Sequence, residues 1–231
     1  MTINITGLIL KKENFREADS KIFLLTKELG LIDAMAVGAK KSRSRLAGQL
    51  EPWREVRLMF IKGNRLDKIG QAVLRDNFKI FADTGWESFW RAQIAVNLIL
   101  KKAPRGLCEK NLYDLVKNFL RLNFKQGCPS QILPIFEWRA AVILGFAPQV
   151  DCCVVCQKKR ETYFFALEKG GIICSNCVEK NARQVKIDGL TIKSLRFILN
   201  QAGGELKLAN MPLNTIKELH QLFEKFLSFH F

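Results

Sequence analysis

The sequence lacks the features of a membrane or secreted protein. Nowhere among its 231 residues is there an apolar run of about 18 to 20 residues, the length that a membrane-spanning helix needs. Residues 1–10 have neither a basic stretch nor a cleavage-site pattern, so no signal peptide is expected. Internal repeats, low-complexity tracts and long linkers are absent as well. These absences predict a cytoplasmic globular protein.

Recognisable catalytic motifs are also missing. The sequence contains no Walker-type phosphate loop, no HExxH and no Gly-x-Ser-x-Gly. His220 and His230 are the only histidines, and neither has a catalytic partner nearby in the sequence. Scattered acidic residues that converge in the fold remain an alternative, but we expect no catalytic residues and no enzymatic activity.

Acidic residues are few relative to basic ones. The chain has 37 Lys and Arg against 22 Asp and Glu, a net charge of +15 with a pI near 9.7. Such an excess favours a polyanionic partner, usually nucleic acid. No predicted helix joins a basic face to a strongly apolar one, which argues against a membrane surface. A basic protein without such a partner is the plainer alternative.

Four of the seven cysteines form two C-x2-C pairs separated by seventeen residues. This spacing is typical of a zinc site, because each pair directs two thiolates at one ion. With sulfur at all four positions, no coordination site remains for water or substrate, so the predicted role is structural. The predicted ligands are Cys153, Cys156, Cys174 and Cys177. Two disulfides or four free thiols are the alternatives.

The residues around these pairs support a zinc ribbon. Residues 163–167 and 172–173 read as two strands joined by a turn at 168–171, so each C-x2-C pair lies at one end of a hairpin. Using Cys152 with Cys156 as the first ligand pair would leave three intervening residues, which suits a zinc motif less well.

The expected compartment is reducing, and buried free thiols are predicted for Cys108, Cys128 and Cys152.

Residues 1–76 read as five short strands separated by turn signals. Five such strands favour a small closed barrel, and the five-stranded barrel that commonly binds oligonucleotides is the OB-fold.

Between the third and fourth strands, residues 39–45 form a segment in which four of seven residues are cationic. We interpret it as a flexible loop that binds phosphates, although a solvated loop is the simpler reading. The predicted DNA-binding residues are Lys40, Lys41, Arg43, Arg45, Arg54 and Arg57.

From about residue 84 the apolar period changes from that of a strand to that of a helix. Predicted N-terminal caps are Thr84, with Glu87 completing a capping box, then Ser130 and Thr191. The first helix has an apolar stripe that we interpret as core rather than as a base-stacking surface, formed by Trp86, Phe89, Trp90, Ile94 and Leu98. The predicted class is α+β, with a barrel (residues 1–78), a helical domain (79–150 and 183–231) and an inserted four-cysteine zinc ribbon (151–182).

Three parts of the sequence resemble the RecO family of bacterial DNA repair and recombination mediators. They are residues 7–44, which include Glu28-Leu29-Gly30-Leu31 and Val37-Gly38-Ala39-Lys40, then Glu137 to Cys156, and Gly170 to Cys177. The resemblance implies an OB-fold, a helical domain and a zinc ribbon. It also implies a protein that binds single- and double-stranded DNA and anneals complementary strands. The implied partners are RecR, the acidic tail of single-strand binding protein, and RecA, which it helps to load.

Two other functions fit parts of the sequence. An RNA-binding translation or ribosome-assembly factor would also combine an OB-fold with a zinc ribbon. A metalloenzyme would need a zinc ion with an open coordination position. Competition between single-stranded DNA and structured RNA separates the first alternative from a DNA mediator.

Overall fold

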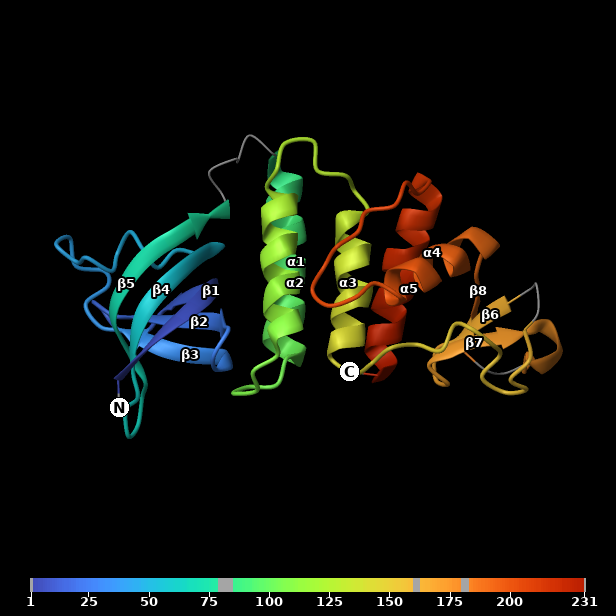
Figure 1. Ribbon diagram of the computed structural model, residues 1–231, viewed down its shortest axis with the longest axis horizontal. Helices are drawn as coiled ribbons and strands as arrows, with labels where there is room; N and C mark the ends of the chain where they lie inside the picture. Colours follow the sequence, from blue (N-terminus) through green and yellow to red (C-terminus); the bar gives the residue numbers. More distant parts are fainter. Residues whose placement is uncertain (1, 79–84, 160–162, 180–182, 231) are drawn as a thin grey trace. The chain divides into compact units, whose positions relative to one another are not determined.

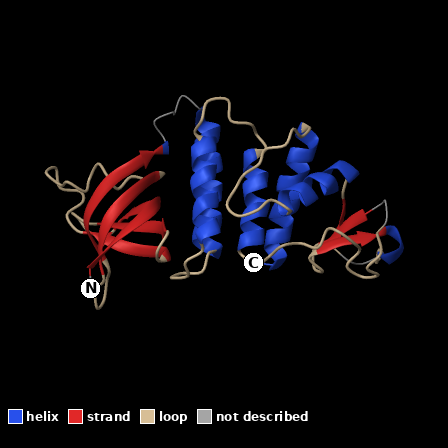
Figure 2. Ribbon diagram, in the orientation of Figure 1, coloured by secondary structure: helices blue, strands red, loops and turns tan. Residues whose placement is uncertain are grey.

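The fold is α+β, as predicted, with five strands followed by helices and a small second sheet (Figures 1 and 2). The computed structural model describes residues 2–78, 85–159, 163–179 and 183–230. Contacts between residues divide the chain into two units, Met1–Cys128 and Pro129–Phe231. The first unit contains the strands β1 to β5 and the helices α1 and α2, so these two helices group with the barrel.

The five predicted strands close into a barrel in the order β1-β2-β3-β5-β4, with β4 pairing back to β1. A bulge between Ile9 and Lys11 bends β1, which lets it pair with both β2 and β4. Apolar side chains from all five strands fill the interior, among them Ile5, Ile22 and Leu58. The strands are β1 (Thr2–Asn14), β2 (Ser20–Thr26), β3 (Gly30–Ala36), β4 (Arg54–Ile61) and β5 (Lys68–Asn77).

Helices α1 (Gly85–Lys102) and α2 (Lys110–Asn123) complete the first unit. An aromatic cluster joins them to the barrel: the ring of Trp53, just before β4, lies 5.3 Å from Phe89 of α1 and 5.2 Å from Phe124 after α2. The segment between the helices also contacts the barrel, since a Cβ on Gly30 would lie 2.0 Å from the carbonyl oxygen of Leu107. Gly30 has a φ of +66°, which favours glycine for a second reason.

The predicted inward face of α1 is partly wrong. Trp86 and Trp90 are 74% and 49% exposed, whereas Ser88 and Arg91 are buried. The polar pair faces inward because the Arg91 guanidinium donates to Asn123 Oδ1 at 2.9 Å and to Ser88. The hydrophobic pattern alone therefore pointed to the wrong side chains.

The second unit contains α3 (Ile132–Ile143), α4 (Gly189–Leu199), α5 (Leu213–His230) and a three-stranded sheet. Trp138 of α3 is fully buried, and its indole N–H donates to the Leu219 carbonyl of α5 at 3.1 Å. Next to it, Glu137 is 2% exposed and lies 2.8 Å from His220 Nδ1. A buried polar pair thus joins α3 and α5.

The predicted caps differ from those in the structure. Thr84 lies outside the described residues. The residue before α3 is Gln131, without a side-chain capping bond, so Ser130 is not its cap. Asp188 caps α4, accepting a hydrogen bond from the Leu190 N–H, whereas Thr191 is buried and donates its hydroxyl proton to Glu218. Aspartate is a favoured N-cap residue. Thr191 instead donates to the Glu218 carboxylate of α5, because a charged acceptor forms a stronger hydrogen bond than a neutral one.

Candidate metal centre and nucleic-acid interface

The four cysteines of the two C-x2-C pairs come together in the second unit. Their sulfur atoms all lie within 4.8 Å of one another. Cys153 and Cys174 are buried, and Cys156 and Cys177 are partly exposed. The strands β6 (Tyr163–Ala166) and β7 (Gly171–Cys174) form the predicted hairpin between the two pairs, and β8 (Gln184–Lys186) adds a third strand beside β6.

The backbone around the cysteines fixes the geometry of this cluster. A Cβ on Gly171 would lie 2.4 Å from the Gln149 carbonyl oxygen, so the hairpin approaches the first C-x2-C segment through a position that only glycine fits. The Val154 N–H donates to the Ile172 carbonyl at 2.9 Å, which ties the two segments directly. Both contacts bring the cysteine pairs together.

The chemistry of the four thiols suits a metal ion. Burial alone would raise the pKa of Cys153, but backbone hydrogen bonds from Cys156, Cys174 and Val155 outweigh it and lower the pKa to about 6. Hydrogen bonding to Cys174 is the main cause that raises the pKa of Cys177 to about 12. Four thiolates this close would repel one another, and a cation among them removes that repulsion.

The spacing of the sulfurs also fits a tetrahedral shell. Metal–sulfur bonds of about 2.3 Å at tetrahedral angles place two sulfurs about 3.8 Å apart. The Sγ atoms of Cys156 and Cys174 are 3.7 Å apart. The four cysteines are therefore placed to hold one metal ion with no open position.

The other three cysteines lie outside this cluster, and they are not buried as predicted. Cys108 is exposed, while Cys128 and Cys152 are intermediate. Cys108 donates to the Lys27 carbonyl, and Cys152 donates to the Gln157 side chain at 3.1 Å. Their sequence neighbours are loop and turn residues, which accounts for the exposure.

The predicted basic loop projects from the barrel between β3 and β4. Lys40, Lys41, Arg43 and Arg45 are all exposed. The first part of the loop is anchored to the turn between β1 and β2: the Gly38 N–H donates to Asp19 Oδ1 at 2.8 Å, and the Lys40 N–H donates to the Ala18 carbonyl at 3.0 Å. The loop is thus held at one end of the barrel rather than being free along its whole length.

Arg54 and Arg57 occupy different settings from the loop cations. The Arg54 guanidinium donates to the Gly48 carbonyl, so it supports the far end of the loop. Arg57 is exposed on β4, opposite Thr6 of β1 and Val73 of β5. The assignment of these six cations to DNA stays a prediction.

Sequence reasoning did not single out two phenylalanines of the β1–β2 hairpin, Phe15 and Phe23. Phe15 lies in the β1–β2 turn beside Arg16, and Phe23 lies in β2 two residues after Lys21. An aromatic residue one or two positions from a cation within a predicted barrel hairpin is the signal that could have identified them.

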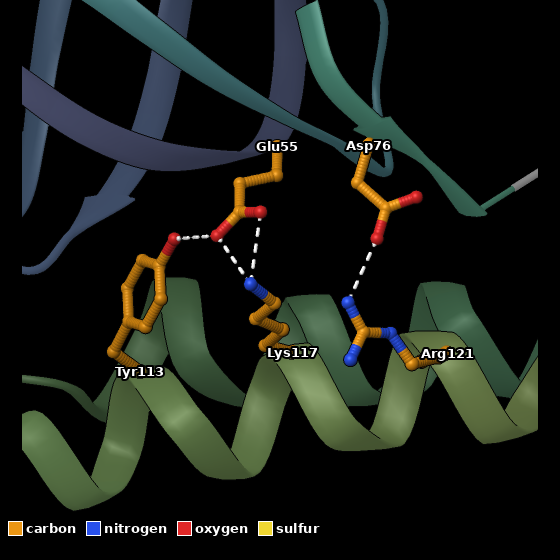
Figure 3. A network of polar contacts seen from close by, with 5 residues as sticks. All are labelled: Glu55, Asp76, Tyr113, Lys117 and Arg121. Carbon is orange, nitrogen blue, oxygen red and sulfur yellow. Dashed lines mark hydrogen bonds and ion pairs between the residues drawn. The ribbon is translucent and has the colours of Figure 1, made fainter.

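A polar network joins the barrel to α2 within the first unit (Figure 3). Glu55 of β4 is 5% exposed and accepts hydrogen bonds from the Tyr113 hydroxyl at 2.7 Å and from Lys117 Nζ at 2.7 and 2.9 Å. One turn further along α2, Arg121 pairs with Asp76 of β5 at 2.9 Å. Tyr113, Lys117 and Arg121 are four residues apart and therefore share one face of the helix.

Among the described helices, none has both the length and the apolar character needed to cross a membrane.

The architecture defines an OB-type barrel protein with a helical region and a four-cysteine ribbon. Two family models match it: "Recombination protein O N terminal" over residues 1–78 and "Recombination protein O C terminal" over residues 88–231. Together they cover nearly the whole chain. The chain belongs to the RecO family, as its sequence resemblance predicted.

Individual relatives agree with this assignment. A protein of Pelotomaculum thermopropionicum named DNA repair protein RecO is 26% identical over 225 residues, which are 97% of this chain and 87% of the relative. Proteins of the same name from Alkaliphilus metalliredigens and Listeria welshimeri are 24% and 28% identical, over 100% and 83% of this chain and 94% and 74% of the relative.

Proposed function

We propose that this protein is a non-catalytic DNA repair and recombination mediator. It binds single- and double-stranded DNA, anneals complementary strands, and helps to load RecA on strands coated with single-strand binding protein. The observation that carries the proposal is the match of both RecO family models along the chain, together with relatives named DNA repair protein RecO. A cytoplasmic location at the bacterial nucleoid follows from this role.

The mechanism is electrostatic. The exposed cations of the basic loop, Lys40, Lys41, Arg43 and Arg45, bind the phosphate backbone and release its counterions. Phosphate contacts carry no sequence information, which suits a protein that acts on any pair of strands, because base pairing supplies the specificity. Charge repulsion between two strands falls when a protein of net charge +15 lies between them.

The metal centre has a structural part in this function. We infer that Cys153, Cys156, Cys174 and Cys177 hold one zinc ion, since four thiolates in a tetrahedral arrangement are a typical structural zinc site. The ion contributes to folding of the ribbon, and with four sulfur ligands it offers no position for substrate. The proposed partners are RecR, the acidic tail of single-strand binding protein and, functionally, RecA.

An annealing assay tests this function. Complementary strands coated with single-strand binding protein should anneal faster when the protein is added, ATP should have no effect, and removal of the partner's acidic tail should reduce the rate. Structured RNA should compete poorly with single-stranded DNA. Annealing that is no faster with the protein than without it, on coated and on bare strands, would remove the mediator role. Preference for the RNA would favour the RNA-binding factor.

A further inference from the structure

The outer surface of the β1–β2 hairpin presents two aromatic rings. Ile22 and Leu24 are fully buried in the barrel core, so Phe23 between them points outward, where it is partly exposed. Phe15, in the turn of the same hairpin, is 46% exposed. Aromatic rings exposed on the surface of an oligonucleotide-binding barrel can serve as stacking platforms for bases.

Two lysines flank the ring of Phe23. Lys11 Nζ, on the paired strand β1, lies 5.9 Å from the ring centroid, and Lys21 Nζ lies 5.1 Å from it. Both lysines also face carboxylates, Lys11 with Glu13 at 2.5 Å and Lys21 with Asp33 at 2.9 Å. The Lys11–Glu13 pair is exposed and adds little stability in water, so a phosphate can exchange for the Glu13 carboxylate. Asp33 also pairs with Arg105, so it keeps a cationic partner when Lys21 binds a phosphate.

Phe15 is joined to the basic loop. The Arg16 guanidinium carbon lies 5.4 Å from the Phe15 ring centroid, and Lys40 Nζ donates to the Arg16 carbonyl at 2.9 Å. The turn that holds the ring and the loop that holds the cations therefore form one surface.

The two rings lie within reach of one nucleic-acid strand. Asn14 pairs with Ser20 at the end of the hairpin, Phe15 follows Asn14, and Phe23 is three residues along β2 from Ser20, about 10 Å at the rise of a strand. A further cation lies near the same end of the barrel: Met35 of β3 pairs with Lys21 on one side and with Lys68 of β5 on the other. In OB-folds this sheet face and its adjoining loops are the usual oligonucleotide surface.

We propose that Phe15 and Phe23 are stacking platforms for the bases of single-stranded DNA, while Lys11, Lys21, Arg16 and Lys40 bind the adjacent phosphates. Every base has a flat face, so stacking adds affinity without reading sequence. Bases in a duplex are already stacked on one another, so the two rings distinguish single strands from duplex DNA. The inference rests on the proposed function and adds to it the means by which the protein prefers an unpaired strand.

The test is a comparison of normal and abasic strands. Fluorescence anisotropy measures binding of the full-length protein to an oligothymidylate of about 16 nucleotides, a site size for one OB-fold. It also measures binding to an abasic oligonucleotide and to a duplex of that length. The variants are Phe15→Ala and Phe15→Trp, with Phe23→Leu as a milder change for the partly buried ring. Phe197→Ala is the matched control, because Phe197 is 42% exposed on α4 of the other unit.

We expect Phe15→Ala to weaken oligothymidylate binding about 5- to 100-fold, the range found for loss of one aromatic–base stack. Binding to the abasic strand and to the duplex should change less than two-fold, and Phe15→Trp should bind like wild type. Phe23→Leu should act in the same direction, and Phe197→Ala should have no effect. Equal binding of the wild type to normal and abasic strands would overturn the stacking role and leave phosphate binding intact. Absence of binding to every probe would instead contradict the proposed function itself.

Discussion

The Tyr113 hydroxyl donates a 2.7 Å hydrogen bond to Glu55 Oε1, which joins helix α2 to strand β4 across 58 residues of sequence (Figure 3). Lys117 donates to both oxygens of the same carboxylate, so its charge is balanced. The proposed DNA-binding barrel is thus fixed to α2 by a buried polar contact as well as by the aromatic cluster at Trp53.

Replacing Glu55 with Gln should lower the free energy of unfolding by about 2–3 kcal/mol. The amide cannot balance the charge of Lys117, which is only partly exposed. The matched variant is Asp76→Asn, which breaks the more exposed pair with Arg121 and should cost less than about 1 kcal/mol. Urea unfolding followed by circular dichroism measures both. Equal effects of the two substitutions would contradict the central role of Glu55.

The contribution of Glu55 to the free energy of unfolding should disappear in acid. Burial acts to raise its pKa, but the bonds from Lys117 and Tyr113 outweigh burial and hold the pKa below its ordinary value of 4.5. A depressed carboxyl pKa stabilises the fold fully above the unfolded-state value, and this stabilisation is lost as pH falls through the folded-state value. The stability difference between wild type and Glu55→Gln should therefore be constant from pH 5 to 7 and shrink below about pH 4. A difference that persists unchanged in acid would show that the charge is unimportant.

The pair Glu137–His220 in the second unit should make the free energy of unfolding fall as pH rises, the opposite of the effect of Glu55. Burial raises the pKa of Glu137 to about 7, and the hydrogen bond with Glu137 raises the pKa of His220, with Glu224 adding to both shifts. The folded pair therefore retains protons that the unfolded chain releases, and stability falls as pH rises from about 5 to 8. Glu137→Gln removes the carboxyl that titrates and should flatten this slope. The prediction fails if wild type and Glu137→Gln show the same slope of unfolding free energy against pH.

Folding of the ribbon should depend on the metal site. Cys174→Ser removes a buried ligand and should abolish metal binding and unfold the ribbon, because a structural zinc ion supplies on the order of 10 kcal/mol of folding free energy. Elemental analysis should find about one zinc per wild-type chain and none in the variant. Cys152→Ser is the control, since Cys152 neighbours the ligand Cys153 but lies outside the cluster. A wild-type ribbon that stays ordered after removal of all metal would refute the structural role.

The sequence was most informative where structure depends on local pattern. Alternating apolar residues predicted the barrel strands, and the spacing of Cys153, Cys156, Cys174 and Cys177 predicted a cluster that the structure brings together. Both signals arise within short segments, so neither requires knowledge of the tertiary fold.

Contacts between distant segments could not be predicted in the same way. The burial of Arg91 depends on Asn123 from the next helix, and this pairing reversed the expected exposure of Trp86 and Trp90. Glu55 likewise finds its partners only after α2 has packed on the barrel. Hydrophobic periodicity identifies a helix, but a polar side chain that gains a buried partner changes which face is inward.

The salt dependence of single-stranded DNA binding by a loop variant tests the electrostatic mechanism most directly. Replacing Lys40, Lys41, Arg43 and Arg45 with Ala should weaken binding and flatten the slope of log K against log salt by roughly 0.7 per lost phosphate contact. Thermal stability should be nearly unchanged, because the four side chains are exposed. The matched variant removes the same charge from exposed positions of the second unit, Lys158, Lys159, Lys217 and Lys225. The loop variant should show a flatter slope and the matched variant a slope near that of wild type. Equal slopes in the two variants would rule out the loop as the phosphate-binding surface.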